Sequence, residues 1–224
     1  MSTNILSQIS ADSLQAGGLA TVLPEYYQLS AIVENSPWHL NQSVFDHSVK
    51  VMRSFEEIMR FEFLPENSRK KAISYFATEV LGMSRLNQLK TVVLLHDIAK
   101  PLVFKKNPDG TAGCSPLHEA LGAAMVGNFQ QRLELSDAVA VRVRQMILLH
   151  GTISEFLNIS LEKNDKVTFF KLFEKLSDDL TNELLCFIFA DIMGSDLKTS
   201  SLQAYEERIS LIQSWLLERF PDNE

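Results

Sequence analysis

Apolar residues recur every three or four positions along most of the chain, which is the spacing of one face of an α-helix. Val44, Met52, Phe55 and Met59 form one such stripe. Runs that alternate β-branched and polar residues, as strands do, are not evident, so the pattern predicts an all-α helical bundle. The predicted helices cover residues 44–62, 67–80, 85–99, 115–133, 136–150, 164–194 with a break near Ser177, and 201–219.

Local signals predict where some of these helices begin. Ser115 before Pro116, and Ser136 before Asp137, have the order of an N-cap residue and a first helical residue. Residues 1–37 are predicted to form a short helical arm ahead of a bundle domain, residues 38–224. The longest connection is the polar loop from Lys105 to Gly113.

Composition narrows the class of protein. The chain has 224 residues, of which 46% are hydrophobic and 22% charged, as expected of one soluble globular domain. A net charge of −7 argues against a broad DNA-binding surface. The two cysteines, Cys114 and Cys186, form no CxxC motif. With no secretory signal pattern and no long apolar run, the sequence predicts a cytoplasmic protein without a membrane partner.

Polar residues on apolar helix faces are the candidate functional residues. Six of them share this property: His47, His96, Asp97, His118, His150 and Asp191. A single buried histidine is usually explained by a hydrogen bond to a neighbour. Six polar groups, two of them carboxylates without an arginine on the same stripes, require a stronger partner. Imidazole and carboxylate ligands together suit divalent Fe, Mn, Zn, Co or Ni, and six ligands fit two ions better than one.

In this order on helices, the six residues resemble the HD superfamily of metal-dependent phosphohydrolases. The segments LATVLPEYYQL, PWHLNQSVFDHSV, LLHDIAKP and ADIMGSD are similar to the linker and C-terminal HD domain of bacterial CCA-adding enzymes, without the nucleotidyltransferase domain. The segments PLHEALGAAMV and ILLHGT resemble the dinuclear members, including HD-type diadenosine tetraphosphate hydrolases. Ala99 stands where such sequences often have glycine, a change that a helix tolerates.

The resemblance implies a role for each residue. His47, His96 and Asp191 would bind one ion, His118 and His150 the other, and Asp97 would bridge the two. Asp97 would thereby support catalysis, and Lys100 would contact a substrate phosphate; the alternative for Lys100 is a cation at a helix C-terminus.

Three further assignments rest on position near these residues. His39 would line the pocket or support a ligand, with a surface histidine as the alternative. Lys105 would extend the phosphate pocket, and Asp46, Glu119 and Asp196 neighbour the expected ligands and could orient them.

The implied reaction is hydrolysis of a small, nucleotide-like phosphomonoester or phosphodiester, including 2′,3′-cyclic phosphates. A hydroxide held between the two metal ions would attack phosphorus. Two alternatives use the same fold: a diiron oxygenase of the superfamily, and a non-catalytic signalling or RNA-binding HD module. The buried carboxylates and the net acidity argue against the second alternative.

Overall fold

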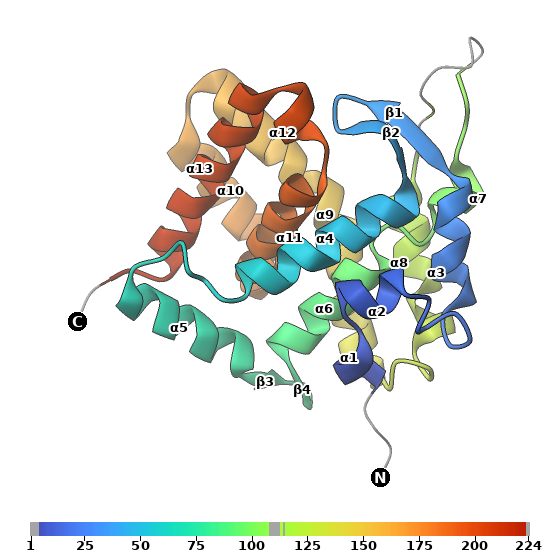
Figure 1. Ribbon diagram of the computed structural model, residues 1–224. Helices are drawn as coiled ribbons and strands as arrows, with labels where there is room; N and C mark the ends of the chain where they lie inside the picture. Colours follow the sequence, from blue (N-terminus) through green and yellow to red (C-terminus); the bar gives the residue numbers. More distant parts are fainter. Residues whose placement is uncertain (1–4, 108–112, 114, 223–224) are drawn as a thin grey trace.

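The computed structural model describes residues 5–107, 113 and 115–222 of the chain. Helices dominate these residues, so the all-α prediction is confirmed (Figure 1). The longer helices are α4 (Val44–Ile58), α5 (Glu66–Ala77), α6 (Arg85–Leu95), α8 (His118–Phe129), α9 (Asp137–Lys163), α10 (Lys166–Ser177), α11 (Thr181–Gly194) and α13 (Leu202–Arg219).

Shorter elements connect the long helices. The helical ones are α1 (Ile5–Gln8), α2 (Ala11–Gln15), α3 (Pro24–Gln28), η1 (Leu29–Ala31), α7 (Lys100–Val103), η2 (Asp178–Leu180) and α12 (Leu197–Ser200). Two antiparallel hairpins are formed by β1 (Val33–Ser36) with β2 (His39–Ser43), and by β3 (Glu79–Val80) with β4 (Met83–Ser84). The sequence pattern predicts no strands here, because segments this short carry too few alternating positions to be recognised.

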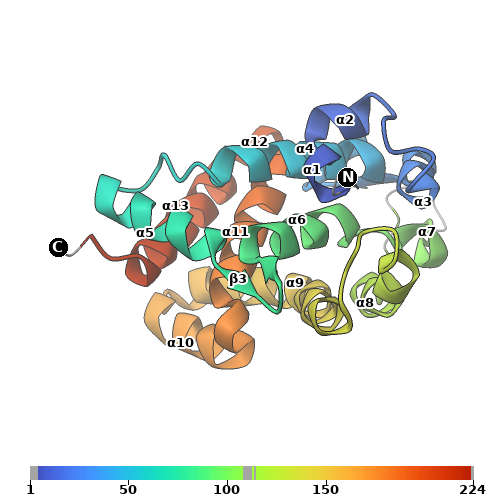
Figure 2. The same ribbon diagram turned by 90° about the horizontal axis from the view of Figure 1, so that it is seen from below.

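The helices form layers that meet at a shared apolar core. In Figure 2, α6 and α11 lie between α4 with the N-terminal helices on one side and α8 to α10 on the other. The N-terminal helices belong to this core, since Leu6, Leu14, Tyr26 and Leu29 are buried in it. The β1–β2 hairpin spans the expected boundary between residues 37 and 38. Under this arrangement, residues ahead of α4 can reach the interior of the bundle.

Several predicted helix ends differ from the structure. Ser136 caps α9 as expected, accepting a hydrogen bond from the Val139 backbone N–H at 3.3 Å. Ser115 does not cap α8, which begins at His118 after Leu117 in a left-handed conformation. The helix predicted to end at residue 99 ends at Leu95, and turns follow.

The helix predicted to end at His150 continues to Lys163. Gly151 therefore lies inside α9, where a Cβ atom would come within 2.6 Å of Glu119 Oε1. This contact is with the end of a flexible side chain, and the helix continues through the glycine without ending.

Helices α4 and α11 approach each other closely at a second glycine. A Cβ atom at Gly194 would lie 2.6 Å from the Val51 backbone nitrogen, so only glycine fits this contact. Asp191 precedes Gly194 by about one helical turn, and His47 precedes Val51 by about one turn. The close contact therefore sets the separation of two helices that both carry expected metal ligands.

A buried ion-pair network joins α6, α9 and α11. The fully buried Glu183 carboxylate accepts hydrogen bonds from Arg85 Nη1 at 2.5 Å, Arg142 Nη2 at 3.0 Å and the Tyr75 hydroxyl at 3.1 Å. Arg142 also pairs with Asp179 in η2. The network fixes the start of α11, at the opposite end from Asp191.

Candidate metal centre

Three of the expected histidine ligands are held by their own helices or turns. Each places Nδ1 within hydrogen-bond distance of the carbonyl oxygen three residues earlier: His96 on Val93 at 2.9 Å, His118 on Ser115 at 2.8 Å, and His150 on Ile147 at 2.6 Å. A carbonyl only accepts, so each Nδ1 carries a proton, and in the neutral ring Nε2 is the nitrogen with the free lone pair. This is the orientation that metal-binding histidines adopt.

The six expected ligands gather into two triads. The first triad joins His47, His96 and Asp191, and the second joins Asp97, His118 and His150. Within each triad, the candidate ligand atoms all lie within 4.8 Å of one another. They come from four helices, α4, α8, α9 and α11, and from the turn that follows α6. The site therefore depends on the packing of the whole bundle.

Asp97 faces both triads with different oxygens. Its Oδ2 lies 3.3 Å from His96 Nε2 and 3.9 Å from His47 Nε2, whereas its Oδ1 lies 3.4 Å from His118 Nε2. A carboxylate in this position can bind one ion with each oxygen. The geometry thus agrees with the bridging role that the family resemblance implies.

The chemistry of the donors fits divalent metal. His96 Nε2 is buried and makes no hydrogen bond among the described residues, and the buried Asp97 Oδ2 has the Lys100 ammonium group 3.0 Å away. Burial and the neighbouring His96 and His118 lower the pKa of His150 to about 4, so its imidazole is neutral near pH 7. Burial opposes ionisation of Asp191, but the hydrogen bond from His47 outweighs it and lowers the pKa of that carboxyl. Neutral imidazoles and ionised carboxylates are the forms that bind metal.

Lys100 lies at the start of α7, buried between two carboxylates. Its ammonium nitrogen is 3.0 Å from Asp97 Oδ2 and 2.8 Å from Glu34 Oε2. Burial alone lowers the pKa of Lys100, but Asp97 and Glu34 more than reverse this and raise it above the ordinary value. The lysine is therefore cationic, beside the metal triads and not in the last turn of α6.

His39 and Glu34 enter the site from the β1–β2 hairpin. The His39 ring meets the His47 ring edge-on with centroids 4.5 Å apart, and its Nε2 lies 3.4 Å from Glu34 Oε2. Burial, with His47 and Lys100 nearby, lowers the pKa of His39 to about 4. His39 thus lines the site rather than the surface. Glu34 was missed by the sequence analysis, because nothing in its local pattern signals a strand pairing that buries it.

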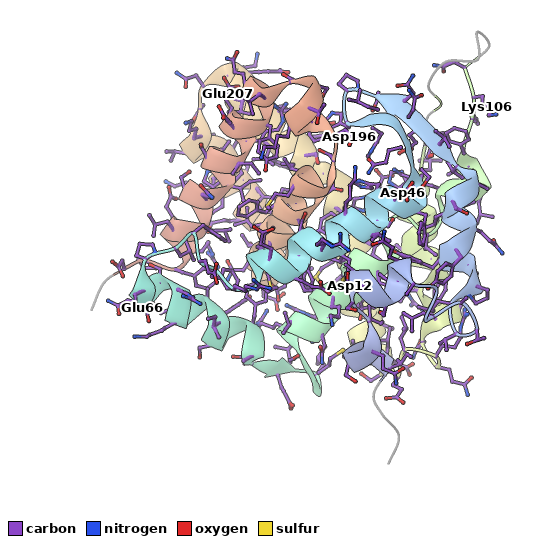
Figure 3. All side chains as sticks on the ribbon, viewed as in Figure 1. Asp12, Asp46, Glu66, Lys106, Asp196 and Glu207 are labelled. Carbon is purple, nitrogen blue, oxygen red and sulfur yellow. The ribbon has the colours of Figure 1, made fainter. Side chains whose placement is uncertain are left out.

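Other residues singled out from the sequence lie around this centre. Glu119 Oε2 is 3.2 Å from His118 Nδ1 and can help to orient that ring. Asp46 accepts a hydrogen bond from Ser43 at the start of α4, on the face that Figure 3 shows together with Asp196. Lys105 is exposed, and its expected contact with substrate stays a prediction. Cys114 and part of the loop from Lys105 to Gly113 lie outside the described residues.

Asp196 supports the hairpin. Its Oδ2 accepts a hydrogen bond from the Leu40 backbone N–H at 2.9 Å, and its Oδ1 pairs with Lys50 at 3.0 Å. Its own backbone N–H donates to the Trp38 carbonyl at 2.7 Å. Neither of the two triads includes it.

Comparison with protein families agrees with the geometry of the site. A family model of the HD domain matches residues 44–192. The chain belongs to the HD family. The match spans all six residues of the two triads and Lys100, whereas Glu34 and His39 lie ahead of it. HD domains bind divalent metals, and the family consists largely of phosphohydrolases together with some non-catalytic members.

Two further findings concern this HD protein. A search of curated proteins gave no match. Among the described residues, no helix combines the length and apolarity needed to span a bilayer.

Proposed function

We propose that this HD protein is a phosphohydrolase that uses two divalent transition-metal ions to cleave small, nucleotide-like phosphomonoesters or phosphodiesters. The observation that carries the proposal is the position of Asp97, whose two oxygens face separate ligand triads. A structural site for one ion needs no second triad and no shared carboxylate. The lysine beside that carboxylate adds a cation suited to phosphate.

The side chains of the site would have three roles: binding metal, binding phosphate and lining the pocket. His47, His96 and Asp191 would hold one ion, His118 and His150 the other, with Asp97 shared between them. When bound, such an ion pair supplies Lewis acidity and lowers the pKa of a water molecule towards neutrality. Lys100 would bind a phosphate oxygen and stabilise the negative charge that develops there. His39 would line the space beside His47.

The substrate class follows from the sequence resemblance. The segments similar to CCA-adding enzymes favour nucleotide 2′,3′-cyclic phosphates, and those similar to diadenosine tetraphosphate hydrolases favour other nucleotide phosphoesters. The burial of the Lys100 cation and the net charge of −7 favour a small substrate over a nucleic acid duplex. Cytoplasmic location remains part of this proposal.

Metal analysis followed by an activity panel tests the function. The protein is purified without added metal, its metal content is measured, and it is assayed with Mn, Fe, Co, Ni or Mg. The substrates are 2′,3′-cyclic nucleotides, nucleoside monophosphates and diadenosine tetraphosphate. We expect metal-dependent hydrolysis of at least one of them. Oxygen consumption with an iron-dependent optical band, and no phosphoester hydrolysis, would replace this function with that of a diiron oxygenase.

A further inference from the structure

A carboxylate from outside the matched HD region reaches the metal centre. Glu34 lies on β1, where it pairs across the hairpin with Gln42. Its neighbour Val33 is 49% exposed, whereas Glu34 is only 8% exposed. The hairpin therefore directs one acidic side chain into the bundle, where burial of a carboxylate costs free energy unless a cation compensates it.

Lys100 is that cation. Its ammonium nitrogen lies 2.8 Å from Glu34 Oε2 and 3.0 Å from Asp97 Oδ2, so the lysine is held from two sides. The two carboxylates have different surroundings. Asp97 faces the histidines of both triads, whereas Glu34 belongs to neither triad. Glu34 remains available to Lys100 when Asp97 binds metal.

Metal loading makes this second carboxylate necessary. Two divalent ions bring twice the positive charge that Asp97 and Asp191 neutralise. A buried ammonium group beside them is repelled, and the low polarity of the site strengthens that repulsion. A second carboxylate in contact with Lys100 offsets this repulsion. Glu34 is the group that the structure provides there.

We propose that Glu34 is a positioning residue that holds the Lys100 ammonium group at the edge of the loaded metal centre, oriented to bind a phosphate oxygen. The inference rests on the proposed function for the identity of the anion. It adds a requirement for the β1–β2 hairpin, which lies ahead of the matched HD region.

The hairpin has its own attachment, which makes a test of Glu34 possible. Asp196 binds the Leu40 backbone N–H and Lys50, and the Trp38 carbonyl accepts from the Asp196 backbone. Removal of the Glu34 charge therefore leaves these contacts intact. Asp196→Asn is the matched control, because it removes a carboxylate from the same hairpin environment without touching Lys100.

The experiment measures binding of inorganic phosphate to the manganese-loaded protein by titration calorimetry. The variants are Glu34→Gln, Lys100→Met, the double variant, and Asp196→Asn, each with its metal content measured. We expect Glu34→Gln to weaken phosphate binding roughly tenfold, the scale of one charge-assisted hydrogen bond. The double variant should bind no more weakly than Lys100→Met, because both changes remove the same contact. Metal content should stay at the wild-type level, and Asp196→Asn should bind phosphate normally.

Several results would overturn the proposal. If the double variant loses as much phosphate-binding free energy as the two single variants together, Glu34 acts independently of Lys100. Unchanged phosphate affinity in Glu34→Gln would remove its role, and tighter binding would make it a competitor of phosphate. If Glu34→Gln does not fold, Glu34→Asp keeps the charge at a shorter reach and should bind phosphate measurably more weakly than wild type; unaltered affinity would again refute the role. Because turnover is not needed, absence of phosphoester hydrolysis would refute the proposed function separately.

Discussion

Substitution of Asp97 by asparagine tests the metal centre most directly, because it keeps the side-chain shape and removes the charge that faces both triads. In the metal-free protein, the absence of an arginine on these helix faces predicts a neutral or stabilising effect. The structure changes this expectation, since Lys100 lies 3.0 Å from Asp97 Oδ2. Removing one partner of a buried ion pair costs about 3–5 kcal/mol when the other charge is left unpaired. Glu34 still pairs with Lys100, so we expect the free energy of unfolding to fall by about 1–2 kcal/mol.

The effect should be larger when metal is present. A ligand at about 1,000 times its dissociation constant stabilises the native state by about 4 kcal/mol. In a domain of this size, each kcal/mol shifts the melting temperature by about 2–4 °C, so saturating metal should raise that of the wild type by about 8–16 °C. Asp97→Asn should lose more than half of this rise, because both triads lose their shared ligand.

Melting curves of the two proteins, with chelator and with excess manganese, measure both quantities. Asp196→Asn is the control, as its carboxylate lies outside both triads and the metal-induced rise should persist. Elemental analysis of each sample links the thermal shift to bound metal. An Asp97→Asn protein with the full wild-type rise and two bound ions would refute the bridging role and, with it, the dinuclear centre.

Three further outcomes are expected. Saturated protein should contain about two metal ions per chain by elemental analysis, because the ligands form two triads, and a ratio fixed at one would exclude the second site. Lys100→Met should lower kcat/KM for the phosphoester roughly a hundredfold with metal content retained, the scale of losing one group that stabilises transition-state charge; unchanged kinetics would leave Lys100 a purely structural cation. Glu183→Gln should lower the free energy of unfolding by about 3 kcal/mol in a denaturant titration, because Arg85 and Arg142 lose their common buried counter-ion. An unchanged unfolding midpoint would contradict that reasoning.

The convergence of the six ligands could be anticipated from the sequence because helical periodicity converts positions in the chain into directions in space, whereas their division between two ions came from the family resemblance. His47 and Asp191 fall on apolar stripes, and a residue on such a stripe must face the core. Packing of the helices then brings the six side chains together. The fold class follows from the same periodicity, which persists through most of the chain.

The hairpin contribution could not be anticipated in this way. Glu34 reaches Lys100 through strand pairing across a short turn, in a hairpin that also contacts Asp196, far away in sequence. His39 was placed in a loop ahead of the first long helix, although β2 turns it against His47. Local pattern identifies neither contact. The helix predicted to end at His150 continues to Lys163, because a single glycine inside a helix is tolerated and is no reliable sign of its end.

The close approach of α4 to α11 has a consequence for how this protein tolerates mutation. Gly194 has no side chain that could bind metal, yet a methyl group there would meet the backbone of Val51. The helices would have to separate, and His47 would move away from Asp191, which now lies 3.0 Å from it. A saturation screen for inactive variants that still fold should therefore recover substitutions at position 194 together with those of the histidines. Substitution of a residue that binds neither metal nor substrate would then have the same effect as loss of a ligand.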